Sequence, residues 1–269
     1  MRRFLLPLQD ELTKIWAFAY KNWIMSRRNF FTLLEILFWP IVGFLSVGLL
    51  AEFAALKPEM RAFVLIGVVT MGTVQVCQLD VSYSLLYDVW SKALKHGFIA
   101  PVGTRHMLLG SLLVGMFRGT IVFFILLIAS LWFFDFNFMI PGPGPIILFL
   151  FGVFLSAAVV GMLVCLLVLI FGNRAEVAAW SLASLILLVC GIYYPVTILP
   201  GWVTAVSKLI PLTYFLEYFR LFYGFEPNFS FVLLKGYVMA FVYLFVEIFL
   251  MNAALGYAKR KGILLKLSE

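Results

Sequence analysis

The chain has 269 residues, of which 64% are hydrophobic, 17% aromatic and only 12% charged, with a formal net charge of +7. A water-soluble globular protein carries about 25% charged residues, so this composition excludes that class. The apolar residues gather in runs long enough to cross the roughly 30 Å hydrocarbon core of a bilayer as helices.

The sequence therefore predicts an all-α polytopic membrane protein that forms one transmembrane domain over residues 1–269. A domain of this length with six spans leaves no room for a soluble catalytic domain. The six predicted spans are residues 33–50, 63–79, 107–134, 146–171, 177–194 and 237–257.

The placement of basic residues predicts the orientation in the membrane. If the N-terminus is inside, fourteen of the 20 Lys and Arg residues flank the spans on that side, five lie outside and Arg118 falls within a span. Cytoplasmic flanks collect Lys and Arg, so both termini are predicted to be cytoplasmic, in the cytoplasmic (inner) membrane. The basic surplus then reflects orientation and contact with anionic lipid and not nucleic-acid binding.

Residues 10–30, ahead of the first span, have the pattern of an interfacial helix. Apolar residues recur at helical spacing on one side and basic residues on another: Leu12, Trp16, Ala19 and Trp23 against Lys14, Lys21 and Arg28. This pattern favours a helix in the plane of the membrane surface, and the alternative is an ordinary solvated face.

The segment between the second and third spans predicts a short amphipathic helix over residues 87–99 on the cytoplasmic side. Trp90 and Leu94 belong to its apolar stripe, whereas Asp88 and Lys92 point elsewhere. Pro101 stops the helix. Such a helix suits docking either to a partner or to the lipid surface.

The connection from Pro195 to Lys235 is apolar although it is too interrupted to span. Pro195, Pro200 and Pro211 divide it into short pieces. Residues 195–222 are predicted to enter the membrane and return, with a pair of helices on the lipid surface as the alternative.

Three charged residues fall inside or at the ends of predicted spans: Asp80, Arg118 and Glu247. A charge at mid-bilayer costs at least about 2.5 kcal/mol, so each needs a partner or water. We expect Arg118 to pair with Asp80 or Glu247, either to stabilise packing or to line a polar pathway. Gly115 and Gly119 form one GxxxG motif beside Arg118, which permits close helix approach.

Motifs for catalysis and nucleotide binding are missing. The sequence contains no G-x-x-x-x-G-K-[ST], HExxH or G-x-S-x-G, and its two histidines lack a carboxylate at catalytic spacing. The chain is therefore not expected to be an enzyme or to bind a cofactor, and another subunit would supply any energy.

Three segments give the chain a resemblance to the membrane subunits of type-2 ABC exporters. The first is the interfacial segment with Arg27–Phe30 leading into Leu37–Pro40, and the second is residues 87–99 followed by Ala100–Arg105. The third, before the last span, is the most specific: Gly191–Val196, Leu199–Trp202 and Ile210–Tyr214.

The resemblance implies a permease that is a dimer, with a second copy of the chain and two cytoplasmic P-loop ATPase subunits that hold ATP and Mg. The predicted helix over residues 87–99 would be the coupling helix, which carries the contacts with the ATPase at Asp88, Trp90, Lys92 and Leu94. Residues 195–222 would be a re-entrant hairpin that forms an outer gate. The predicted gate residues are Tyr194, Pro195, Pro200, Trp202, Pro211 and Tyr214. Substrates in this family include lipid-linked polysaccharides, lipids and amphipathic drugs.

A second function remains open at this point. The chain could be an ion-coupled carrier or channel without an ATPase, in which Asp80, Arg118 and Glu247 are the coupling groups. The six spans show no evident inverted repeat, which disfavours this alternative.

Overall fold

The computed structural model describes residues 2–28, 30–92, 102–171 and 176–260, and within these ranges the protein is helical with no strand. The expected all-α fold is confirmed. Five helices are long and apolar enough to cross a membrane: α2 (Phe30–Phe53), α3 (Pro58–Trp90), α5 (Thr104–Phe134), α6 (Pro143–Phe171) and α10 (Val232–Arg260).

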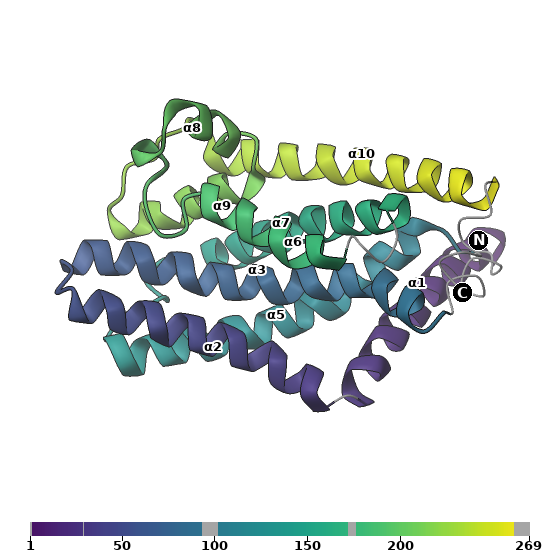
Figure 1. Ribbon diagram of the computed structural model, residues 1–269, viewed down its shortest axis with the longest axis horizontal. Helices are drawn as coiled ribbons and strands as arrows, with labels where there is room; N and C mark the ends of the chain where they lie inside the picture. Colours follow the sequence, from purple (N-terminus) through teal and green to yellow (C-terminus); the bar gives the residue numbers. More distant parts are fainter. Residues whose placement is uncertain (1, 29, 93–101, 172–175, 261–269) are drawn as a thin grey trace.

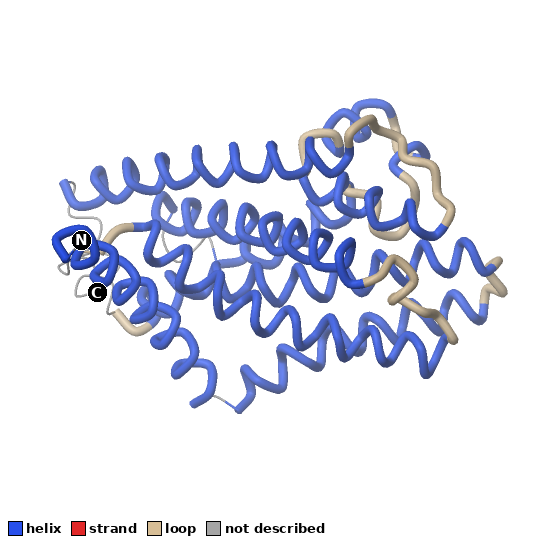
Figure 2. Tube along the Cα trace, turned by 180° about the vertical axis from the view of Figure 1, so that it is seen from behind, coloured by secondary structure: helices blue, strands red, loops and turns tan. Residues whose placement is uncertain are grey.

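The long helices lie side by side (Figure 1); α2, α3, α5 and α6 alternate in direction, whereas α10 runs parallel to α6. Helix α1 (Arg2–Arg28) lies across one end of this bundle, which we call the α1 end, and α10 finishes there too. The short helix α8 (Gly201–Ser207) lies at the opposite end, called the α8 end, where irregular segments gather (Figure 2). The start of α1 and the end of α10 therefore share one side of the bundle.

Helices α3 and α6 form the centre of the bundle, and small residues let their neighbours approach closely. A Cβ atom on Gly115 of α5 would lie 3.0 Å from the carbonyl oxygen of Cys77 in α3. A Cβ on Gly119 would lie 2.8 Å from the ring of Phe154 in α6. The GxxxG motif of α5 thus provides the close helix approach predicted from the sequence.

Two elements differ in length from the predicted spans. Helix α3 has 33 residues, and at 1.5 Å per residue it is about 50 Å long, so it projects beyond the hydrocarbon core. Helix α7 (Glu176–Val189) has 14 residues and a length of about 21 Å, shorter than the predicted span over residues 177–194. The chain turns at Gly191, whose φ of 82° is left-handed, and so the helix cannot continue to Tyr194.

The end of α3 also corrects the predicted coupling helix. Residues 87–90 continue α3 and do not begin a new helix, because no helix-breaking residue separates them from the span. The backbone turns at Ser91 and Lys92, where Lys92 has a left-handed φ of 56°. The rest of the predicted helix, including Leu94, lies outside the described residues.

The segment before α10 is divided into short helices by its prolines, as predicted. Pro195 precedes a 3-10 turn at Val196–Ile198, Pro200 precedes α8, and Pro211 begins α9 (Pro211–Arg220). A proline suits the first turn of a helix because the backbone N–H it lacks would be unpaired there. Helix α9 is buried against α6 and α10, and a second 3-10 turn, Leu221–Tyr223, follows it.

Candidate functional site

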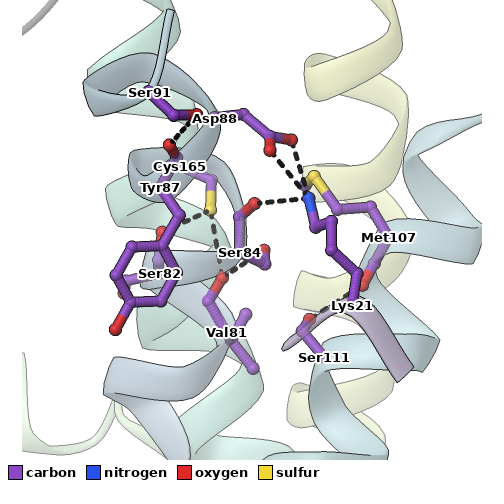
Figure 3. Close-up of polar contacts among 10 residues, drawn as sticks. All are labelled: Lys21, Val81, Ser82, Ser84, Tyr87, Asp88, Ser91, Met107, Ser111 and Cys165. Atoms are coloured by element: carbon purple, nitrogen blue, oxygen red, sulfur yellow. Dashed lines mark hydrogen bonds and ion pairs between the residues drawn. The ribbon is translucent and has the colours of Figure 1, made fainter. Parts of the chain in front are cut away.

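An ion pair joins α1 to the end of α3. The Lys21 ammonium lies 2.9 and 2.8 Å from the two carboxylate oxygens of Asp88, and it also points at the backbone carbonyl of Ser84 (Figure 3). Both side chains are partly buried, with 31% and 16% of their surface exposed, so solvent weakens the pair only in part. Asp88, which the resemblance assigned to ATPase contacts, is held by its own chain.

A second set of contacts joins α1 to the start of α5. His106 Nδ1 accepts a hydrogen bond from the Gly103 amide at 2.9 Å, so the Nε2–H donates to Glu11 across another 2.9 Å. Arg105 and Lys14 also contact the Glu11 carboxylate. Hydrogen bonds from His106 and then Lys14 lower the pKa of Glu11 below its usual range.

Between these two anchor points the helices touch through backbone. A Cβ atom on Gly110 of α5 would lie 2.6 Å from the carbonyl oxygen of Ile15 and 2.6 Å from the Cβ of Phe18. No larger residue fits there without moving α1. The connection between α3 and α5 is therefore flanked on both sides by fixed contacts with α1.

The end of α3 carries an aromatic face made of Tyr83, Tyr87 and Trp90. The three ring centroids lie 5.4 to 5.5 Å apart, and Trp90 is 42% exposed. Leu86, one turn before Trp90, is by contrast fully buried in the core. Tyr83 and Tyr87 were missed, although Tyr83 lies seven and Tyr87 three residues before Trp90, a spacing that puts all three on one helix face.

Inside the bundle, Arg118 of α5 forms an ion pair with Asp80 of α3. Both residues are buried, with 5% and 9% of their surface exposed. The contact joins one guanidinium nitrogen, Nη1, to one carboxylate oxygen. The other two nitrogens of Arg118, Nε and Nη2, have no hydrogen-bond partner in the described chain. Of the two partners expected for Arg118, the structure brings Asp80 to it.

Glu247 lies apart from this pair, in a cavity at mid-height of the bundle. The cavity has a volume of about 210 Å³ and is lined mainly by aliphatic side chains of α3, α6 and α7 and by residues 209–212, with Tyr243 and Glu247 from α10. Glu247 is 8% exposed, and its Oε2 atom has no hydrogen-bond partner within the described ranges.

The predicted gate residues are spread over the α8 end. The Tyr194 hydroxyl donates to the Leu188 carbonyl and that of Tyr214 to the Lys208 carbonyl, so both fix backbone turns. Trp202, by contrast, is 76% exposed on α8.

Arg220 holds this end together and was not singled out from the sequence. Its guanidinium donates to the backbone carbonyls of Gly191, Ile192 and Phe63 at 2.7 to 3.1 Å and lies 3.3 Å from the centre of the Phe63 ring. It therefore joins the end of α9 to the turn after α7 and to the start of α3. A charged residue in an otherwise apolar segment is the signal that could have identified it.

Comparison with known families gives one match over most of the chain. The model of the ABC-2 type transporter membrane family matches residues 13–223, which contain α3, α5, α6, α9 and both partners of the Lys21–Asp88 ion pair. The chain belongs to the ABC-2 type transporter family. It is the membrane permease of such a transporter, and the family implies an ATPase partner subunit.

A second similarity is local. An uncharacterized protein of Archaeoglobus fulgidus is 46% identical to the permease over 62 residues, which are 23% of this chain and 97% of that protein. This similarity adds no information on function.

The residues predicted as functional thus fall into four separate places in the permease, of which the gate residues at the α8 end are one. Asp88 and Trp90 lie at the α1 end, Asp80 and Arg118 pair within the bundle, and Glu247 faces its own cavity. No hydrogen bond or ion pair joins Glu247 to Asp80 or Arg118, all three of which are in the described ranges.

Proposed function

We propose that this permease belongs to an ATP-driven exporter that moves an amphipathic substrate, such as a lipid-linked polysaccharide, a lipid or a drug, across the cytoplasmic membrane. The α1 end faces the cytoplasm in this proposal. Support comes from the fourteen-to-five excess of basic residues on that side and from the family match.

The observation that carries the proposal is the pair of contacts between α1 and the flanks of the α3–α5 connection. Lys21 holds Asp88 on one flank, and Glu11 holds His106 on the other. A force applied to the connection would move α1, α3 and α5 as a unit. The helices are joined by the Lys21–Asp88 and Glu11–His106 contacts and, at Gly110, by close approach of the backbone. This is the mechanical link that an external motor needs.

The motor is a cytoplasmic P-loop ATPase subunit that holds ATP and Mg. Its docking surface on the permease is the aromatic face of Tyr83, Tyr87 and Trp90, together with Lys92 and Leu94 in the adjoining connection. Support comes from the half-exposed Trp90 at the end of a helix that projects beyond the hydrocarbon core. Aromatic side chains of this kind dominate the binding energy of protein interfaces.

Two permease copies form the working unit, each in contact with lipid along its outer helices. The aromatic side of α1 supports its place at the membrane surface, since Trp16, Tyr20 and Trp23 border an apolar groove against α5. The homodimer rests on the family alone, and the mass of the purified permease–detergent complex tests it.

A matched pair of tryptophan variants tests the docking surface. The Trp90→Ala variant should no longer copurify with the ATPase subunit and should not transport. The control is Trp132→Ala, which changes a more exposed tryptophan at the α8 end of α5 and should keep both copurification and transport. Equal copurification and equal transport in the two variants would contradict the docking surface. Unchanged thermal unfolding of both variants is the control for folding.

The alternative of an ion-coupled carrier loses support from two observations. Family membership favours a permease driven by an ATPase, and the three charges that would form an ion path are divided between a closed pair and a separate cavity. Arg118 and Asp80 then serve to fix α5 against α3.

A further inference from the structure

The cavity beside Glu247 combines an apolar wall with a buried carboxyl group whose Oε2 atom has no hydrogen-bond partner among the described residues. Its aliphatic lining includes Val74, Val160, Leu163, Ile186 and Leu212. Its volume of about 210 Å³ exceeds that of the about 150 Å³ engineered protein cavity that binds benzene. An aromatic ring or a short hydrocarbon group fits a space of this size.

The other polar side chains of the wall already donate hydrogen bonds to backbone carbonyls. Among the described lining residues, Glu247 is therefore the one that can recognise a ligand by charge. The Tyr243 hydroxyl donates to the carbonyl of Leu209, and the Ser156 hydroxyl donates to that of Gly152. No Lys, Arg or His is among the described residues that line the cavity. Glu247 is more than nine-tenths buried, and its Oε2 atom has no hydrogen-bond partner in the part of the chain that the structure describes.

A buried carboxylate without a partner is costly, and a cation is the partner that stabilises it best. Since the cavity wall supplies no cation, a ligand with a protonated amine beside an apolar body would complete the site. Its ammonium would donate to Glu247 while its hydrocarbon part contacts the aliphatic wall.

We infer that this cavity is a binding site for amphipathic organic cations, in which Glu247 recognises the ammonium group. The inference rests on the proposed export function and names the substrate class for it. The cavity is bounded by α6, α7 and α10 and by residues 209–212, which include the start of α9, so a bound cation lies beside Pro211 of the predicted outer gate.

The test measures binding to the purified permease in nanodiscs, without the ATPase subunit and without transport. The probes are 4-fluorobenzylamine and 4-fluorobenzyl alcohol, which share a ring and differ in charge. Fluorine NMR reports the bound fraction of each, and empty nanodiscs correct for partition into lipid. Two variants with closely matched shapes complete the set: Glu247→Gln removes the charge, and Tyr243→Phe removes a neighbouring hydroxyl but keeps the carboxylate.

The wild-type permease should bind the amine at least about tenfold more tightly than the alcohol, since hydrogen bonds to charged groups are the strong ones. Glu247→Gln should abolish this preference and Tyr243→Phe should keep it. Equal binding of the two probes to the wild type, binding of neither, or a preference that survives in Glu247→Gln would overturn the inference. Because the assay contains no ATPase, its failure would leave the docking test above unaffected.

Discussion

The ion pair between Arg118 and Asp80 offers a quantitative test of the bundle. Replacing Asp80 with Leu leaves a buried guanidinium with no ion partner, and two of its three nitrogens have no hydrogen bond in the described chain even before the change. Removing one partner of a buried ion pair costs about 3–5 kcal/mol of unfolding free energy. We expect Asp80→Leu to lie in this range. Arg118→Met should cost less, because a buried carboxyl can take up a proton and become neutral.

The double variant Asp80→Leu/Arg118→Met should recover most of the lost stability, since apolar residues often replace a buried ion pair at little cost. The matched control combines Arg118→Met with Glu247→Gln. It should recover none of the stability that Arg118→Met loses, because Glu247 does not contact Arg118. Reversible unfolding by SDS in mixed micelles, followed by circular dichroism, measures the unfolding free energies of the wild type and of the four variants. A double variant as unstable as Asp80→Leu, or an Asp80→Leu protein as stable as the wild type, would refute the pairing.

Three further predictions concern the contacts of α1. Exchanging the charges in Lys21→Asp/Asp88→Lys should restore transport that Lys21→Asp alone impairs, and failure of the exchange to restore it would argue against this link. Gly110→Leu should displace α1, whose backbone lies within 2.6 Å of the added Cβ, and limited proteolysis should then cleave α1 faster; an unchanged rate would contradict the close contact. Protonation of Glu11, whose pKa is lowered in the folded protein, should release His106 as the pH falls below the ordinary carboxyl pKa of 4.5. The stabilisation is fully present above that pH and is lost as the pH falls through the lowered pKa of Glu11, so the hydrogen-exchange protection of α1, relative to the intrinsic rate at each pH, should fall on acidification in the wild type but not in Glu11→Gln.

Much of the bundle could be predicted from the sequence because lipid forces backbone groups to pair within each segment. Long apolar runs therefore mark α2, α3, α5, α6 and α10 in the right order. Their ends were less predictable, since α3 continues through polar residues that no lipid argument covers.

The site was predictable in part. A lone Arg118 in an apolar run demands a partner, but the choice between Asp80 and Glu247 depends on how α3 and α10 rotate, which the sequence does not contain. The Lys21–Asp88 and Glu11–His106 contacts join residues 67 and 95 positions apart, and local patterns give no sign of such pairs. The cavity at Glu247 is lined by side chains from elements that are far apart in the sequence, so no local pattern predicts it.

The central claim is that this permease is a passive path opened by a separate ATPase. Uphill flux of an amphipathic dye into proteoliposomes, measured with the permease alone and with the ATPase subunit and ATP added, tests it directly. The dye should accumulate against its gradient only when both subunits and ATP are present. Accumulation by the permease alone under an ion gradient would contradict the claim and would favour the ion-coupled carrier.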